Sequence, residues 1–342
     1  MTTAAESSRI GAAGPDVLLD AVDLDKTFRN GVRAADSVSL RIRRGETLGV
    51  VGESGCGKST TAKMILQLLT PDQGHLTFDG VDLLAARGRR LRALRRRLQL
   101  VPQNPQTSFN PRLSIRSSIG FNLRAHRYPR REWRERVDRL LDRVGLAARH
   151  GESFPHELSG GQLQRAAIAR ALATEPDLVI CDEAVSALDK SVQAQVLNLL
   201  VDLQRELGVS YLFISHDLSV VEHISDRVLV MYLGRVVEEA PPDVLYRDPG
   251  HPYTRSLLAS APGFEGERTV LQGEPPSPAS PPSGCVFRTR CPYAMPRCAL
   301  ERPLLLAGQP GQLIACHLND PRASDAEHSA APPAAVATPT GQ

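Results

Sequence analysis

Residues 52–59 read Gly52-Glu53-Ser54-Gly55-Cys56-Gly57-Lys58-Ser59 and fit the pattern G-x-x-x-x-G-K-S. Glycines in such a loop let the backbone bend so that several N–H groups point at one anion. The lysine of this pattern reaches the β- and γ-phosphates of a nucleotide, and the hydroxyl after it can ligate Mg²⁺. The stretch therefore predicts a phosphate-binding loop.

The sequence on either side of this loop has the patterns that the loop requires. Before it, the apolar run from Thr47 to Val51 is typical of a buried parallel strand. After it, apolar residues recur at helical spacing from Lys58 to Leu69, and Pro71 closes the predicted helix. The positive end of the helix dipole would face the same phosphates. Cys56 lies beside this helix start, which favours a thiolate there.

The composition indicates a soluble, globular protein. The chain has 342 residues, 42% hydrophobic and 23% charged, with a net charge of +3. No apolar run approaches the roughly 20 residues of a membrane span. Residues 1–15 lack the apolar core of a signal peptide, so we expect a cytosolic protein with a disordered lead over residues 1–16.

Arginine makes up seven of the eleven residues from 87 to 97, which raises the question of nucleic-acid binding. An apolar stripe of Leu91, Leu94 and Leu98 runs through this segment, and no aromatic residues interleave to stack on bases. The pattern favours a solvated helix face, and no nucleic-acid partner is expected.

Short strands precede the phosphate-binding loop, with a hairpin signal at Asn30-Gly31. Phe28 lies near that hairpin. It could stack on an adenine ring or fill a core at the end of a strand, and taken alone the pattern favours the core.

A second glycine-rich stretch, Leu158-Ser159-Gly160-Gly161-Gln162, precedes a predicted helix from Leu163 to Ala173. Ser159 suits a helix N-cap, and the glycines expose N–H groups at the helix start. This arrangement predicts a second anion site.

Two carboxylates follow the buried strand that begins at Leu178, and ligands bind at such strand ends in open α/β sheets. Asp182 could hold Mg²⁺ through water, and Glu183 could orient and deprotonate an attacking water. His216 follows the next strand at the same edge, where position alone does not separate a structural role from a catalytic one.

These stretches resemble, in order, the motifs of the ABC-type ATP-binding cassette over residues 17–250. The resemblance implies a RecA-like α/β core with an antiparallel β subdomain and an inserted helical subdomain at about residues 105–170. It also implies a head-to-tail dimer in which ATP lies between Lys58 of one cassette and Ser159 of the other.

The same resemblance implies roles for individual residues. Phe28 would stack on adenine, Glu183 would be the catalytic base and His216 would contact the γ-phosphate, with Lys58 as the third catalytic group. The remaining implied contacts to ATP within one cassette are residues 52–59, Thr60 and Gln103. The partner cassette would contribute Ser159, Gly160, Gly161 and Gln162, and Ser186 and Asp189 would belong to the D-loop. The implied ligands of Mg²⁺ are Ser59, Gln103 and Asp182.

Four of the six cysteines fall between residues 285 and 316, namely Cys285, Cys291, Cys298 and Cys316. Thiols at this density in a cytosolic chain suggest a metal site. The spacing lacks the C-x2-C pairs usual for structural zinc, and four thiolates also suit an iron–sulfur cluster.

Residues 251–320 resemble the C-terminal domain of the ATPases of oligopeptide and dipeptide importers, a family that also includes nickel importers. His251-Pro-Tyr-Thr254 and Cys291-Pro-x-Ala294 carry the resemblance, and Arg288-Thr-Arg290 is more similar to the second ATPase of the pair than to the first. The family implies a [4Fe–4S] cluster on the four cysteines, with Zn²⁺ as the alternative. Residues 321–342, rich in Ala, Pro and Thr, are expected to form a disordered tail.

This resemblance implies an ATPase subunit, peripheral at the cytoplasmic face of the cell membrane, that drives uptake of di- or oligopeptides. Its expected partners are a second ATPase subunit in a heterodimer, two transmembrane permease subunits and an extracytoplasmic solute-binding protein. The open alternatives are a nickel importer ATPase, a soluble ABC-type ATPase that acts on nucleic acid or ribosomes, and a cluster-dependent regulator.

Overall fold

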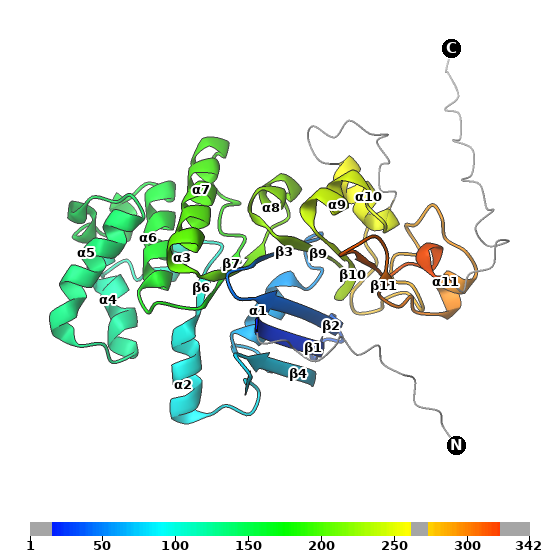
Figure 1. Ribbon diagram of the computed structural model, residues 1–342, viewed down its shortest axis with the longest axis horizontal. Helices are drawn as coiled ribbons and strands as arrows, with labels where there is room; N and C mark the ends of the chain where they lie inside the picture. Colours follow the sequence, from blue (N-terminus) through cyan, green and yellow to red (C-terminus); the bar gives the residue numbers. More distant parts are fainter. Residues whose placement is uncertain (1–15, 261–272, 322–342) are drawn as a thin grey trace, which may run out of the picture.

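The computed structural model describes residues 16–260 and 273–321. The predicted disordered lead, up to residue 15, and the predicted tail, from residue 322, lie outside the described residues. The described part of the molecule is elongated, with a lobe of helices at one end and residues 273–321 at the other (Figure 1). We call residues 251–260 and 273–321 the C-terminal extension. Two sheets lie between these ends.

The larger sheet has eight strands in the order β11-β12-β10-β9-β3-β8-β7-β6. Its parallel part places β3 at the centre, between β8 and β9. The parallel strands are β3 (Thr47–Val51), β6 (Leu98–Val101), β7 (Leu178–Asp182), β8 (Ser210–Ile214) and β9 (Arg227–Tyr232). The prediction of a buried parallel strand before the phosphate-binding loop is confirmed.

Both faces of the parallel strands are buried, because alternate residues enter two different cores. In β7, Val179 and Cys181 pack with the helices on one face, while Leu178 and Ile180 pack on the other. The first face is covered by α6 (Gly160–Leu172), α7 (Lys190–Leu207) and α8 (Leu218–Ile224). The second is covered by α1 (Lys58–Ile65) and the smaller sheet. Continuous apolar runs are therefore what these strands require.

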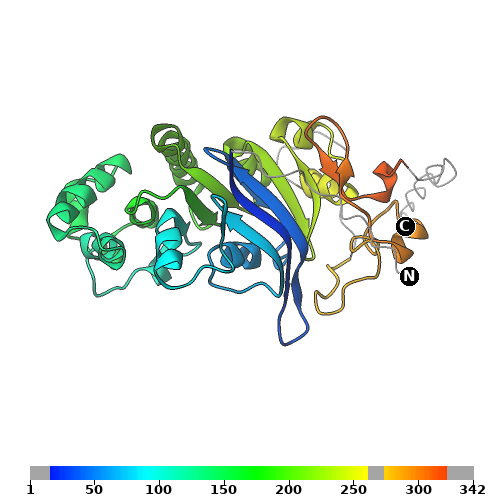
Figure 2. The ribbon, with the colours of Figure 1, turned by 60° about the horizontal axis from the view of Figure 1, so that its bottom comes forward.

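The smaller sheet is antiparallel, with the order β2-β1-β4-β5. Its strands are β1 (Val17–Thr27), β2 (Arg33–Arg43), β4 (Gln73–Phe78) and β5 (Val81–Asp82). The hairpin predicted at Asn30-Gly31 joins β1 to β2, and Gly31 has the left-handed φ of 81° that such a turn favours. Figure 2 shows these two long strands crossing the middle of the molecule.

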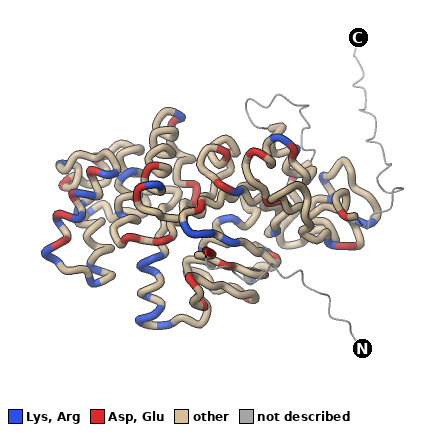
Figure 3. Tube along the Cα trace, viewed as in Figure 1, with Lys and Arg blue, Asp and Glu red and all other residues tan. Residues whose placement is uncertain are grey.

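The lobe of helices contains α3 (Pro105–Ser108), α4 (Ile115–Ala125) and α5 (Trp133–Arg143), packed against α6. The arginine-rich helix α2 (Gly88–Arg97) stands apart from this lobe in Figure 3, with basic residues along it. Leu94 is its buried residue, and Arg97 pairs with Asp79 and Asp177. The predicted solvated face around an apolar stripe matches this arrangement.

The C-terminal extension is joined to the larger sheet. After β10 (Arg235–Ala240), the chain forms α9 (Pro242–Arg247), α10 (Pro252–Ala259), α11 (Arg297–Leu300), β11 (Leu306–Ala307) and β12 (Leu313–Ile314). Strand β12 pairs antiparallel with β10, so the extension continues the sheet of the nucleotide-binding core. Glu238 of β10 is fully buried there and accepts hydrogen bonds from the N–H groups of Gly250 and His251 and from the side chain of Gln312.

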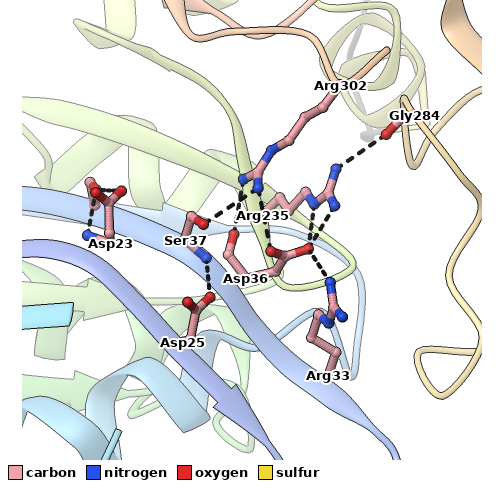
Figure 4. Close-up of polar contacts among 9 residues, drawn as sticks. Asp23, Asp25, Arg33, Asp36, Ser37, Arg235, Gly284 and Arg302 are labelled. Atoms are coloured by element: carbon pink, nitrogen blue, oxygen red, sulfur yellow. Dashed lines mark hydrogen bonds and ion pairs between the residues drawn. The ribbon is translucent and has the colours of Figure 1, made fainter. Parts of the chain in front are cut away.

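A second connection between the extension and the core is a cluster of charges around Asp36, shown in Figure 4. The buried Asp36 carboxylate pairs with Arg33 at 3.3 Å, with Arg235 at 2.7 Å and with Arg302 of the extension at 3.4 Å. Arg235 also donates to the carbonyl oxygen of Gly284 at 3.2 Å. We call Asp36 and its three arginines the Asp36 junction.

The helix after the phosphate-binding loop is shorter than predicted. Helix α1 ends at Ile65, four residues before the predicted end at Leu69. Gln67 has a φ of 55°, a left-handed value that cannot continue an α-helix, so the chain leaves the helix before Pro71 is reached.

Candidate functional site

The phosphate-binding loop is shaped in part by Gly52 and Gly57, which leave no room for a side chain. Gly57 has a φ of 106°, and a Cβ atom there would lie 2.1 Å from the carbonyl oxygen of Ala34 in β2. Gly57 is also the N-cap of α1, and a glycine has no side chain that could cap the helix. Within residues 16–260 and 273–321, the first N–H groups of α1 therefore have no capping partner, and helix N-termini of this kind bind anions.

Lys58 is the lysine of the phosphate-binding loop, and its side chain turns back toward the start of that loop. Its side chain is buried, and Nζ donates to the carbonyl oxygens of Gly52 at 2.6 Å and Glu53 at 3.1 Å. An ammonium group held by neutral acceptors keeps its charge available for a phosphate that enters the loop.

Asp182 reaches the start of α1 from the end of β7. The hydroxyl of Ser59 donates to Oδ1 of Asp182 at 2.9 Å. Burial raises the pKa of Asp182 and the neighbouring Glu183 charge adds to this, although the Ser59 hydrogen bond acts in the opposite direction. A hydroxyl and a carboxylate placed together in this way suit Mg²⁺, which prefers oxygen ligands.

Three further predicted residues meet at the same sheet edge. The amide of Gln103 donates to Oε2 of Glu183 at 2.7 Å, and Nδ1 of His216 lies 3.6 Å from the same oxygen. Glu183 has a φ of 48°, a left-handed value uncommon for this residue type, and its N–H donates to Ile214 at 2.9 Å. Uncommon backbone conformations of this kind gather at functional sites. Gln103, Glu183 and His216 thus come from three separate strand ends.

The second glycine-rich stretch, residues 158–162, leads into α6 with Ser159 as the predicted N-cap, but the helix starts at Gly160, before the predicted start at Leu163. Ser159 is the N-cap: its Oγ accepts from the N–H of Gln162, and the side chain of Gln162 accepts from the N–H of Ser159. A Cβ atom on Gly161 would lie 2.5 Å from Val192 of α7, so this glycine permits close helix packing. At Gly160 the nearest atom would be 3.7 Å away, which is ordinary contact. Ser159 and Gly160 are exposed.

The remaining residues predicted for the nucleotide site lie in loops or near the ends of helices and strands. Phe28 follows β1 and is 39% exposed, so its ring is not a core residue in this chain. Ser54 and Gly55 are exposed in the loop, and Thr60 is half-buried in α1. Ser186 donates to the carbonyl oxygen of Glu183 at 2.9 Å. Asp189 is the N-cap of α7 and accepts from the N–H of Val192.

The expectation of a thiolate at Cys56 is wrong. Its side chain is buried, and burial raises the pKa of the thiol despite the nearby ammonium of Lys58, 3.9 Å from Sγ. The helix start lies beside Cys56, but desolvation of the charged form outweighs it.

Sequence reasoning missed two contacts to the loop from the C-terminal extension. The N–H of Glu53 donates to the hydroxyl of Tyr253 at 2.9 Å, and Arg290 donates to both carboxylate oxygens of Glu53, at 3.1 and 2.9 Å. These partners lie 200 and 237 residues away along the chain, so no local pattern could have indicated them.

The four clustered cysteines line one small cavity, together with His251 and His317. Burial raises the pKa of Cys291 to about 11 and that of Cys316 to about 12, so these thiols are protonated at neutral pH. Across residues 16–260 and 273–321, no group of three or more His, Cys, Asp or Glu side chains is arranged to hold a metal ion. The prediction that the cysteines meet is confirmed, although the described side chains are not arranged as the ligands of an iron–sulfur cluster or of zinc.

Comparison with known families covers both parts of the chain. The ABC transporter family matches residues 35–186, and the family described as the oligopeptide/dipeptide transporter C-terminal region matches residues 237–298. Among solved structures, the chain is similar to cbiO1 of Clostridium perfringens, part of an ABC transporter complex. That match has a TM-score of 0.63 and 31% identity over 68% of this chain and 92% of the other. A dimeric structure of the ATP-binding cassette MJ0796 bound to ADP and Pi gives a TM-score of 0.60 at 29% identity over 66% of this chain and 99% of that chain.

Curated relatives match over most of their length. The oligopeptide transport ATP-binding protein OppF of Escherichia coli is 49% identical over 90% of this chain and 98% of its own. AppF of Bacillus subtilis, also named an oligopeptide transport ATP-binding protein, is 48% identical over 90% of this chain and 99% of its own.

The helices of the described chain, from residue 16 to 260 and from 273 to 321, include none with both the length and the hydropathy of a bilayer span. Three observations indicate the same family. They are the α/β cassette fold, the glycine loop and carboxylate pair at one sheet edge, and the near-complete alignment with curated relatives. The chain belongs to the family of oligopeptide/dipeptide ABC transporter ATP-binding proteins.

Proposed function

We propose that this chain is the ATP-hydrolysing subunit of an importer that couples ATP binding and hydrolysis to uptake of di- or oligopeptides across the cytoplasmic membrane. The observation that carries this proposal is the meeting of Gln103, Glu183 and His216 beside the Ser59–Asp182 pair at the end of the phosphate-binding loop. The names of the curated relatives support peptides as the solute class.

In the proposed mechanism, the loop N–H groups and Lys58 hold the β- and γ-phosphates, and Phe28 stacks on the adenine. Ser59, Gln103 and Asp182 would hold Mg²⁺, and the bound ion would neutralise negative charge on the phosphates. Glu183 orients the attacking water and takes its proton. His216, whose Nδ1 lies 3.6 Å from Oε2 of Glu183, would contact the γ-phosphate. Positioning and charge stabilisation of this kind account for most catalysis of phosphoryl transfer.

The proposed assembly is a head-to-tail pair of cassettes. Ser159 and Gly160 are exposed at the start of α6, which supports their contact with ATP bound to a partner cassette. Gly161 and Gln162 would complete that contact. Ser186 and Asp189 of the D-loop would lie between the two ATP sites. The second cassette would be a different ATPase subunit. Two transmembrane permease subunits and an extracytoplasmic solute-binding protein would complete the importer, with this chain peripheral at the cytoplasmic face.

An uptake assay tests this function. Proteoliposomes that contain the chain, its neighbouring membrane subunits, the second ATPase and the binding protein should accumulate a labelled tripeptide only when ATP is present. Vesicles assembled without this chain are the control. Accumulation of labelled nickel in place of peptide would mean that the importer carries nickel and not peptides. ATPase activity stimulated by nucleic acid or ribosomes, and not by the membrane subunits, would contradict the importer.

We also propose that the four cysteines take up a metal centre, a [4Fe–4S] cluster with Zn²⁺ as the alternative. Their shared cavity and the preference of such clusters for four thiolates support this, and each thiol must lose its proton on loading. Anaerobically purified protein should contain iron and inorganic sulfide in similar amounts. Cys291→Ser should lose both, whereas Cys181→Ser, a buried cysteine in β7, should keep them. If the purified protein holds no metal and its extension has four titratable thiols, the proposal is wrong. If it holds stoichiometric zinc, the metal centre is a zinc site and not a cluster.

A further inference from the structure

Glu53 of the phosphate-binding loop is held by the C-terminal extension at both its backbone and its side chain. Tyr253 accepts the Glu53 N–H at 2.9 Å. Arg290 donates to the two carboxylate oxygens at 3.1 and 2.9 Å. The side chain of Arg290 is only 6% exposed and that of Glu53 is 25% exposed, so solvent screens this pair weakly.

An aromatic cluster fixes the position of Arg290. The rings of Tyr232 in β9, Tyr253 in α10 and Phe287 in the extension pack together, with centroid separations of 4.7, 5.3 and 5.5 Å. The guanidinium of Arg290 lies over the Tyr232 ring at 5.9 Å and donates to its hydroxyl at 3.4 Å. Arg290 therefore approaches Glu53 from a rigid support and does not depend on a mobile side chain.

The charge of Glu53 is unfavourable for the loop in which it lies. The loop is built to hold the phosphates of a nucleotide, and an unpaired carboxylate on the same loop would repel them. The paired guanidinium offsets that charge, and its Nη1 atom, which contacts both oxygens of the carboxylate, restricts how the Glu53 side chain can turn.

We propose that Arg290 is a positioning residue for nucleotide binding: it neutralises Glu53, so the phosphate-binding loop accepts ATP with full affinity only when the C-terminal extension is docked on it. This inference rests on the nucleotide site and is independent of which solute the importer carries.

The Asp36 junction supplies a matched control. Arg302 also joins the extension to the core, through Asp36 and Ser37 of β2, and it has no contact with Glu53 among the described residues. Removing Arg302 tests the effect of weaker docking alone, whereas removing Arg290 tests the charge at the loop.

The experiment measures the affinity of the full-length chain for Mg-ATP by calorimetric titration. Arg290→Met should weaken binding roughly tenfold, equivalent to about 1.4 kcal/mol, and Arg290→Lys should recover most of this loss. Arg302→Met should stay within about twofold of the wild type, because it leaves the loop charge unchanged. In a Glu53→Gln background, Arg290→Met should cost less than about twofold, because no carboxylate remains to be neutralised.

Two results would overturn the inference. One is an equal loss from Arg290→Met in the wild-type and Glu53→Gln backgrounds, which would mean that Arg290 acts through the fold and not through charge. The other comes from Glu53→Gln alone, which remains informative even where Arg290→Met does not fold. The proposal expects this variant to bind ATP at least as tightly as the wild type, since glutamine carries no negative charge that would repel the phosphates. Weaker binding would make the contact a simple structural clasp.

Discussion

Replacing Glu183 with glutamine should leave ATP binding intact and lower ATP hydrolysis by roughly 10²- to 10⁴-fold, the usual contribution of a positioned general base. Glutamine keeps the shape of the side chain, and its carbonyl oxygen can still accept the hydrogen bond that Gln103 now donates to Oε2. It cannot take a proton from water. The loss should therefore fall on the chemical step and not on nucleotide affinity.

Single-turnover release of phosphate, measured beside equilibrium binding of ATP, separates these two effects. Glu206→Gln is the matched control, because Glu206 lies in α7 on the surface and pairs with Arg143, far in role from the nucleotide. Turnover of Glu183→Gln near the wild-type rate would assign the base elsewhere, with His216 the next residue to replace. Loss of ATP binding in this variant would mean that Glu183 shapes the site.

Replacing Asp36 with alanine should destabilise the chain by about 3 kcal/mol, because it leaves the guanidinium of Arg235, only 14% exposed, without its carboxylate. Arg33 and Arg302 would then repel it as well. A loss of this size corresponds to a fall of roughly 6–12 °C in the melting temperature of a domain of this size. Asp72→Ala is the control: its carboxylate pairs with Lys26 and is 44% exposed, so we expect about 1 kcal/mol or less.

The Asp36 junction also predicts how stability depends on pH. Burial pushes the pKa of Asp36 upward, but Arg235, Arg302 and Arg33 outweigh it and hold the pKa below its ordinary value. A carboxylate with a lowered folded-state pKa contributes stability that is complete above its unfolded pKa, about 3.9, and is lost as the pH falls through the lower folded value. Asp36→Asn should therefore flatten the acid limb of the stability curve. An unchanged acid limb would mean that other carboxylates control it.

Local sequence patterns predicted the parts of the site that lie within one motif. The strand before the phosphate-binding loop, the hairpin at Asn30-Gly31 and Ser159 as the N-cap of α6 all follow from short-range preferences, and the structure confirms them. The strand-end carboxylates were placed by the general rule for α/β sheets, and Ser59 and Asp182 do meet.

Features that depend on tertiary contacts were not predictable in this way. The early end of α1 depends on the left-handed Gln67, where no glycine marks the break. The position of Cys56 beside a helix start favours a thiolate, but burial raises the pKa of this thiol, and a local pattern does not show that burial. Arg288 and Arg290 flank the same threonine, and the sequence does not distinguish them. Only the structure shows that Arg290 contacts Glu53, whereas Arg288 contacts Ser283.

The pairing of β10 with β12 affects how genes of this family can be recombined. A chain stopped at residue 250 would leave one edge of its main sheet bare, and Glu238 would lose the donors that His251 and Gln312 now provide in a fully buried pocket. Bare edges recruit strands from other molecules. Chimeras between relatives should therefore exchange the cassette and its C-terminal segment as a unit, since a splice at that point would divide a single sheet between two parents.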